Sequence, residues 1–265
     1  MTASDVLLDR HGAVAVLTLN RPAAGNTVNM ALALALEQRV DEVIADDGVR
    51  CVVLTGAGKL FCGGGDIGAF ADAGTDAGAF LFDLAGALHR SVLKLAAMAK
   101  PLVTLVNGPA AGAGLSLAIS GDVVLCAANT HFTAAYGGVG LTPDGGMSWL
   151  LPRLVGLRRA QDMIITNRRI GTEEAAVIGL VTRVVAPDDL LREGLALAAS
   201  LANGPTRAIG GARALLAASF QNDLASHLDL EAARIAVAGD GPEAREGIAA
   251  FLTRRKPDFT ERTNP

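Results

Sequence analysis

Two glycine-rich stretches could stabilise a negative charge, because each directly follows a segment that is predicted to be a buried strand. Residues 61–66 (FCGGGD) follow the apolar run at 51–55, and residues 107–114 (NGPAAGAG) follow the run at 102–106. In a parallel sheet, the loop after a strand faces the ligand crevice. Glycine lets the backbone come close to a ligand, and free N–H groups there can bind a developing oxyanion. The two loops together predict two such donors.

Either loop taken alone also fits a tight turn between a strand and a helix, since a single glycine cluster is a weak signal. The second loop, however, runs into residues 113–119 (AGLSLAI), which read as a helix. The first turn of a helix carries N–H groups without an intrahelical acceptor and a partial positive charge. This arrangement favours the anion-stabilising interpretation over the turn.

The apolar pattern of the first two thirds predicts strands that alternate with helices. The expected elements are a hairpin of 6–8 and 14–19 with its turn at 10–12, a helix at 30–45 capped by Asn29, a strand at 51–55, a helix at about 78–98, a strand at 102–106, a helix at 113–119 and a strand at 122–126. Such alternation implies an α/β fold with parallel pairing and right-handed crossovers.

The last third changes character from about residue 187, where strand signals vanish. Candidate helices cover 187–202, 205–219, 221–239 and 242–254. An all-helical region of this kind packs against partner subunits or caps its own subunit, and the pattern leaves both open. We therefore expect a core of residues 1–186 and a helical region of residues 187–265.

Composition excludes several classes of function. The chain has 265 residues, of which 51% are hydrophobic and 19% charged, which fits one main globular domain. It contains neither an apolar run of membrane-spanning length nor a secretory signal, so a cytoplasmic protein is expected. A net charge of −4, with one Trp and one Tyr, argues against nucleic-acid binding. Three cysteines have the spacing of neither a disulfide framework nor a metal site.

Several motifs spread over nearly the whole chain carry a resemblance to a known family. They are residues 19–22 (LNRP), 54–56 (LTG), 61–67 (FCGGGDI), 140–146 (GLTPDGG) and 245–251 (REGIAAF). With them the chain resembles the crotonase superfamily, the enoyl-CoA hydratase/isomerase family. The resemblance implies a spiral of ββα units, a C-terminal helical region that forms a homotrimer or hexamer, and an acyl-CoA thioester as substrate with no separate cofactor.

The resemblance also implies roles for individual residues. By position, the family's two oxyanion-hole amides fall on Gly65 and Ala113, and loss of one such donor costs ~3 kcal/mol of transition-state stabilisation. The Gly63 carbonyl is expected at the CoA adenine, and Phe251 and Arg254 are expected to reach CoA from the C-terminal helix of the same or a neighbouring subunit. Further candidates for the substrate pocket are Asp66, Ile67, Phe70, Tyr136, Val139 and Trp149. The apolar ones equally fit an ordinary core, and the basic run 254–256 equally fits a solvated helix end.

Two departures from the family pattern bear on the reaction. Hydratases of this family use two glutamates, and the matching positions here hold Ser116 and Tyr136. Asp144 is the acidic residue that remains in the right loop, and it also fits a turn or a helix cap. Isomerases and dehalogenases of the family carry their working aspartate at the matching place. The surrounding motifs are similar to the phenylacetyl-CoA ring-epoxide isomerase type.

The sequence therefore favours an isomerase in which Asp144 takes a proton from one carbon of the acyl group and returns it to another. Segment 71–78 reads as a mobile loop that could set access of the acyl chain. The alternatives are an enoyl-CoA hydratase and a non-catalytic acyl-CoA binder. A Ser116 nucleophile with His89 or His131 as base is a further class, but no Gly-x-Ser-x-Gly elbow is present.

Overall fold

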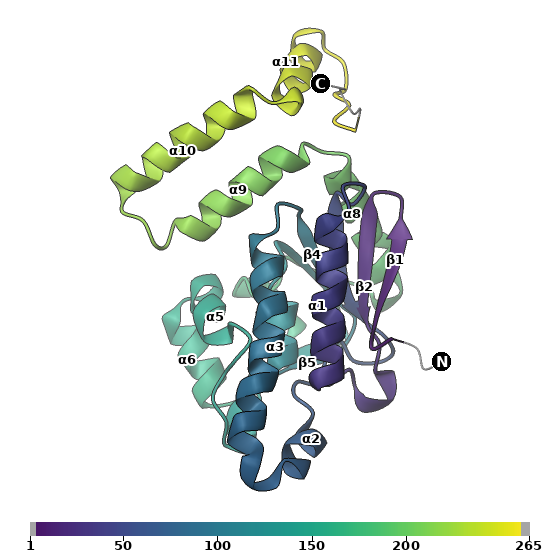
Figure 1. Ribbon diagram of the computed structural model, residues 1–265, viewed down its shortest axis with the longest axis vertical. Helices are drawn as coiled ribbons and strands as arrows, with labels where there is room; N and C mark the ends of the chain where they lie inside the picture. The colour runs from purple at the N-terminus through teal and green to yellow at the C-terminus, as the bar shows by residue number, and fades with distance from the viewer. Residues whose placement is uncertain (1–3, 261–265) are drawn as a thin grey trace.

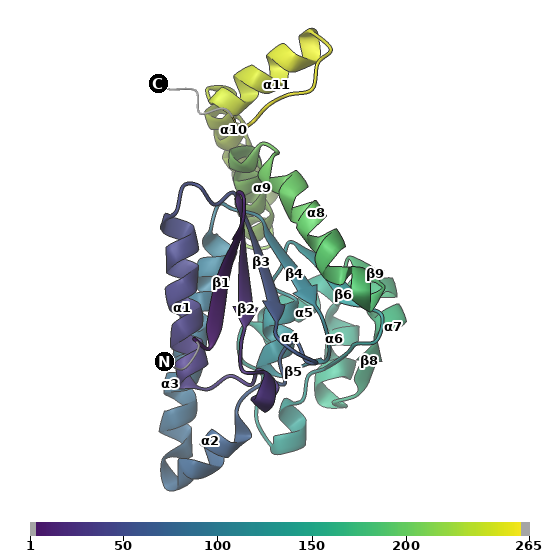
Figure 2. The ribbon, with the colours of Figure 1, turned by 90° about the vertical axis from the view of Figure 1, so that its right-hand side faces the viewer.

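The computed structural model describes residues 4–260, and a six-stranded sheet forms its centre. The strand order is β1 (Val6–His11), β2 (Val14–Leu19), β3 (Cys51–Gly56), β4 (Leu102–Val106), β6 (Val123–Ala127) and β9 (Arg183–Val185). β1 and β2 are antiparallel, and each later pair of neighbours is parallel (Figure 2). The sheet is thus mixed: β1 is an antiparallel strand at one edge, and the strands from β2 to the other edge, β9, are parallel.

Helices cover both faces of this sheet. α1 (Met30–Ala45) and α3 (Ala77–Ala97) lie side by side on one face, and α8 (Leu190–Ala202) packs on the other (Figures 1 and 2). Along β2, Ala15 and Leu17 belong to the core under α1 and α3, whereas Val14 and Val16 belong to the core under α8. Burial on both faces explains why the central strands read as continuous apolar runs.

Most of the predicted elements are confirmed. α1 has the expected bounds, and Asn29 caps it by accepting the Leu32 N–H at 2.9 Å. The expected helix at 113–119 is α4 (Ala113–Ala118). After α8, the chain forms α9 (Thr206–Ala218), α10 (Leu224–Gly239) and α11 (Pro242–Leu252), close to the predicted positions. The expected division of the chain at residue 186 stays a prediction.

Two local predictions were wrong. The hairpin turn is not at 10–12, because Arg10 and His11 still pair with β2 and the turn consists of Gly12 and Ala13. Segment 71–78 is not a loop: α2 (Ile67–Asp72) ends there, a 3₁₀ turn (Gly74–Asp76) follows, and α3 begins at once. The glycines of this segment suggested a loop, but backbone hydrogen bonds of helical type continue through it.

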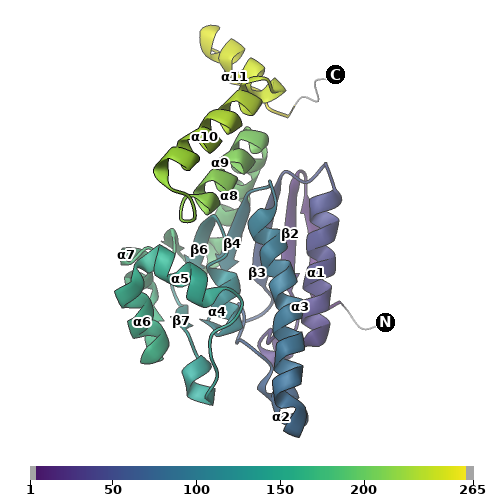
Figure 3. The same ribbon diagram turned by 60° about the vertical axis from the view of Figure 1, so that its left-hand side comes forward.

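A second, small sheet was not predicted. It consists of β5 (Ala110–Ala111), β7 (His131–Thr133) and β8 (Arg169–Gly171), with β5 parallel and β8 antiparallel to β7. The helices α5 (Met147–Val155), α6 (Leu157–Ile165) and α7 (Thr172–Val177) lie on this side of the molecule (Figure 3). β5 lies inside the second glycine-rich loop, so the small sheet fixes that loop in place.

The helices α9–α11, which we call the C-terminal arm, extend away from the core (Figure 1). Arg213 of α9 secures the arm by donating to the carbonyls of Leu95, Met98 and Lys100 and by an ion pair with Asp122 at 2.7 Å. No residue of α10 is buried in the described chain. Over residues 4–260, none of the helices has both the length and the apolar character that a membrane span requires.

The two glycine-rich loops are joined through their backbones. The Ala111 N–H donates to the Cys62 carbonyl at 3.0 Å, and the Cys62 N–H donates to the Pro109 carbonyl at 3.4 Å. A Cβ on Gly114 would lie 2.2 Å from the Cys62 oxygen, and Gly64 has φ +104° with its Cβ position 3.0 Å from the Ala111 oxygen. Both positions therefore require glycine.

We expect Gly114→Ala to destabilise the fold by about 1–3 kcal/mol, because the new methyl group meets backbone that cannot move aside. Urea unfolding at a fixed protein concentration measures this difference. Gly86→Ala in α3 is the matched control, since nothing lies within 4 Å of its Cβ position, and it should be neutral or stabilising by up to ~1 kcal/mol. Wild-type stability of Gly114→Ala would contradict the close contact.

Candidate active site

The first glycine-rich loop leaves one backbone donor free. The Val28 N–H donates to the Gly64 carbonyl at 2.7 Å, and the Asp66 N–H donates to the Val28 carbonyl at 3.0 Å. These bonds bracket Gly65 without using its own N–H. Within residues 4–260, the Gly65 N–H has no protein acceptor, so it is available to a ligand.

The chain before this loop is fixed by Asn26. This residue is fully buried and has φ +55°. Its side-chain amide donates to the carbonyls of Ala57 and Leu60 at 2.8 Å each, and its side-chain oxygen accepts the Arg21 N–H at 2.8 Å. All polar atoms of the buried amide thus have partners, which makes the entry to the loop rigid.

The second loop leaves a corresponding donor. Gly112 turns the chain with φ +52°, and its N–H donates to the Thr133 carbonyl of β7 at 3.1 Å. The Ser116 N–H donates to the Gly112 carbonyl at 3.1 Å, as in a helix. The Ala113 N–H has no acceptor in the part of the chain that the structure describes, as expected for the first turn of a helix.

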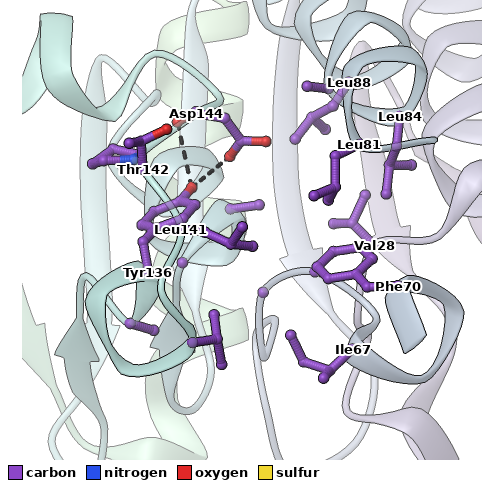
Figure 4. Close-up of a pocket in the computed structure, with 18 of the residues that line it drawn as sticks. Val28, Ile67, Phe70, Leu81, Leu84, Leu88, Tyr136, Leu141, Thr142 and Asp144 are labelled. Carbon is purple, nitrogen blue, oxygen red and sulfur yellow. Dashed lines mark hydrogen bonds between the residues drawn. The ribbon is translucent and has the colours of Figure 1, made fainter. Parts of the chain in front are cut away.

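Both free donors belong to residues that line one cavity of about 360 Å³. One wall is apolar and includes Leu81, Leu84 and Leu88 of α3. The opposite wall carries Tyr136 and Asp144, and Figure 4 shows these two side chains facing the leucines across the cavity. A ligand in this space therefore has apolar contact on one side and a carboxylate on the other.

Asp144 points its carboxylate into the cavity and is held there by Tyr136 (Figure 4). The Tyr136 hydroxyl donates to Oδ1 of Asp144 at 2.5 Å. The helix-cap interpretation of Asp144 does not apply, because the cap of α5 is Gly146 and no side chain caps that helix. Its backbone does form the turn, since its carbonyl accepts the Met147 N–H at 3.1 Å, while the carboxylate stays with Tyr136.

Ser116 is hydrogen-bonded to the loop that carries Asp144. Its hydroxyl donates to the backbone carbonyl of Asp144 at 3.0 Å. Within the described residues, no hydrogen bond joins Ser116 to His89 or His131. The nucleophile and base pair considered from the sequence is therefore not assembled, and Ser116 serves the Asp144 loop instead.

Comparison with known proteins identifies the family. A sequence profile described as enoyl-CoA hydratase/isomerase matches residues 9–262. The chain belongs to the enoyl-CoA hydratase/isomerase family. Members of this family act on CoA thioesters, so the protein is an acyl-CoA enzyme with the crotonase fold.

Individual relatives cover nearly the whole chain. The chain is 38% identical to 1,2-epoxyphenylacetyl-CoA isomerase of Escherichia coli, over 93% of this chain and 95% of the relative. It is 33% identical to crotonyl-CoA hydratase of Syntrophomonas wolfei, over 98% and 99%. A solved enoyl-CoA hydratase from a Polaromonas species matches with a TM-score of 0.92 and 30% identity, over 96% and 98%. Relatives named as isomerases and relatives named as hydratases therefore both match this chain.

Some of the remaining candidate residues line the cavity, and others do not. Gly63, Ile67, Phe70 and Val139 line the cavity together with Gly65, Ala113, Tyr136 and Asp144. Asp66 instead caps α2 by accepting the Ala69 N–H at 3.4 Å, and its carboxylate forms an ion pair with Arg21 at 3.1 Å. The carboxylate of Asp66 is thus engaged in holding the fold.

Besides Asp66, three further candidates do not line the cavity. Phe251 is in α11 and 83% exposed, and Arg254 follows that helix, so both belong to the end of the chain beyond α10. Trp149 in α5 does not line the cavity, and the Arg153 guanidinium lies 3.9 Å from the centre of its ring. The expected contact of Phe251 and Arg254 with CoA stays a prediction.

Sequence reasoning missed the apolar wall. Leu81, Leu84, Ala85 and Leu88 recur at the spacing of one helical face. The helix was predicted, but the face toward the ligand was not assigned. Leu84 and Leu88 also belong to the main core. The apolar pattern of α3 therefore does not distinguish the residues that face the cavity from those that face the core.

The position of Tyr136 alters its acidity. Burial raises the pKa of its phenol above the ordinary value, and the nearby Asp144 carboxylate raises that pKa further. The hydroxyl therefore stays protonated and remains a hydrogen-bond donor to Asp144 over the physiological pH range.

Tyr136 is the single tyrosine of the chain, so the ultraviolet absorbance of tyrosinate reports on it alone. In the folded protein, we expect Tyr136 to remain mostly protonated at about pH 10, where free tyrosine is half ionised. The raised pKa stabilises the fold below about pH 10, and this contribution is lost as pH rises toward the folded-state pKa. The urea-unfolded chain, which should titrate normally, is the control. A normal midpoint in the folded protein would contradict the buried hydrogen bond.

Proposed function

We propose that this protein is an enoyl-CoA isomerase that moves a double bond with one carboxylate base. The observation that carries the proposal is that, among the cavity-lining residues of the described chain, Asp144 alone has a carboxylate. By the family resemblance, Ser116 and Tyr136 fall at the positions that hold glutamates in the family's hydratases. A single base suffices for moving a proton from one carbon to another.

In this proposal, the N–H groups of Gly65 and Ala113 bind the thioester oxygen. Removal of an acyl proton places negative charge on that oxygen, and the two donors stabilise the resulting enolate. Their fixed backbones need no reorganisation during the reaction, and each donor of this kind contributes ~3 kcal/mol. The free state of both N–H groups in residues 4–260 supports this role.

Asp144 then moves the proton. Tyr136 occupies Oδ1, which leaves the second carboxylate oxygen to accept the proton and return it. The wall formed by Leu81, Leu84 and Leu88 excludes water from this side of the acyl group. Exclusion of water favours return of the proton over hydration. The isomerase name of the Escherichia coli relative extends the proposal to ring-epoxide CoA esters as substrates.

We expect Asp144→Asn to lower kcat/KM for isomerisation of 3-enoyl-CoA to 2-enoyl-CoA esters at least 100-fold, because the amide cannot act as the base. Product masses with separation of double-bond isomers measure the reaction. Asp9→Asn, on the exposed part of β1, is the matched control and should keep wild-type activity.

Other outcomes of the same assay identify the alternatives. Addition of one water to a 2-enoyl-CoA ester would make the protein a hydratase, as the crotonyl-CoA hydratase relative suggests. Tight CoA-ester binding without turnover, unchanged in Asp144→Asn, would make it a non-catalytic binder. Either result would overturn the single-base proposal.

We further propose that the C-terminal arm joins copies of the chain into a trimer, or into a hexamer of two trimers. α10 has no buried residue, and its apolar side chains Leu224, Leu228 and Ile235 are 74%, 52% and 74% exposed. Burial of each such side chain contributes about 1.5–3 kcal/mol. Contact between copies would supply that burial.

Analytical ultracentrifugation tests the assembly. We expect the wild-type mass to equal three or six chains, and Leu228→Glu with Ile235→Glu to lower it, because two charges would enter the interface. Thr75→Glu, on the exposed turn before α3, adds charge far from the arm and should leave the mass unchanged. A monomeric wild-type protein would overturn this proposal.

A further inference from the structure

The peptide group between Asp144 and Gly145 is held at both of its polar atoms. Its carbonyl oxygen accepts the Ser116 hydroxyl at 3.0 Å. Its N–H donates to Nε2 of His89 at 3.0 Å. Ser116 belongs to α4 and His89 to α3, so the two partners reach the peptide from different elements. We call these two side chains the peptide clamp.

The two polar atoms of the clamped peptide differ in the number of their hydrogen-bond partners. The Asp144 carbonyl also accepts the Met147 N–H at 3.1 Å, and the Tyr136 hydroxyl lies 3.4 Å from it. The Gly145 N–H has no acceptor other than His89 within residues 4–260. Gly145 is buried, so loss of His89 would leave a buried donor unpaired, which is costly.

The hydrogen bond fixes the protonation of His89. An N–H donor requires a lone pair on Nε2, so Nε2 carries no proton. In neutral imidazole the proton is then on Nδ1, and in imidazolium neither nitrogen can accept. The clamp therefore requires the neutral Nδ1–H tautomer of His89.

Close packing around Gly145 also restrains the backbone that carries the Asp144 carboxylate. Gly145 has φ +60°, and a Cβ there would lie 2.9 Å from Cβ of Ser116 and 3.7 Å from a methyl group of Leu88. The peptide plane is thus enclosed as well as hydrogen-bonded. Because this peptide directly follows Asp144, fixing its plane fixes the backbone from which the carboxylate extends toward Tyr136.

We propose that His89 is a positioning residue that holds Asp144 in its reactive place. This inference rests on the proposed function, in which Asp144 moves the proton. His89 is absent from the described residues that line the cavity, so it acts through the Gly145 peptide and not on the substrate. Displacement of a reacting group by about 1 Å can lower a rate roughly 100-fold.

Two substitutions separate the hydrogen bond from the bulk of the side chain. His89→Leu removes the acceptor, whereas His89→Gln keeps one in its amide oxygen. We expect kcat of His89→Leu to fall roughly 10- to 100-fold with KM within about threefold of wild type. His89→Gln should keep most of the wild-type kcat.

The matched control is His11→Leu at the exposed end of β1, which should keep wild-type kcat and KM. A role in stability alone would change the melting temperature of His89→Leu but leave kcat of the folded enzyme intact. Full kcat in His89→Leu, or equal loss of kcat in His89→Leu and His89→Gln, would overturn the proposal.

A second measurement uses the wild-type protein and does not depend on how the variants fold. Nitrogen NMR spectra of the imidazole rings distinguish the two tautomers, and the spectrum of His89→Gln assigns the missing signals among the four histidines. We expect His89 to be protonated on Nδ1 and not on Nε2 at neutral pH. Protonation on Nε2 would overturn the clamp. If Asp144→Asn kept full activity, the proposed function would fail while the tautomer result stood.

Discussion

The backbone contact between the two glycine-rich loops is the constraint on which the site depends. Each loop enters it from a rigid neighbour: Asn26 fixes the chain before the first loop, and the small sheet fixes the second through Thr133. The hydrogen bond from Ala111 to Cys62 then sets the distance between them. The free N–H groups of Gly65 and Ala113 follow from this contact, since the neighbouring backbone groups are already used.

The cavity combines two environments that, in the proposed reaction, meet different parts of a thioester. The loops offer donors to an oxygen atom, while α3 offers an apolar surface to the acyl group. Asp144 stands opposite, with one carboxylate oxygen occupied by the buried Tyr136 hydroxyl. A carboxylate restrained in this way keeps one oxygen for proton exchange with a ligand, which is what the proposed isomerase reaction needs.

Three elements near the site could be predicted from the sequence, because β3 and β4 are continuous apolar runs and α1 has a periodic apolar stripe. The two glycine-rich loops could be placed because they follow β3 and β4. β5 has two residues and is set by its neighbours, so periodicity could not reveal the small sheet. Gly74 and Gly78 suggested a loop where helical hydrogen bonds continue. Asp66 matched a candidate site pattern, but its pairing with Arg21 depends on a contact between distant segments. The His89 contact with Gly145 likewise joins residues that no local pattern connects.

Helix α3 takes part in two regions of the molecule. In its N-terminal half it forms the wall of the cavity with Leu81 and Leu84. At its C-terminal end, the carbonyls of Leu95 and of its cap residue Met98 accept from Arg213 of the arm. Its 21 residues make one rod about 30 Å long. A shift of the whole rod would therefore disturb the contact with Arg213 at the other end, so the shape of the cavity wall can change without disturbing the arm only through exchange of side chains.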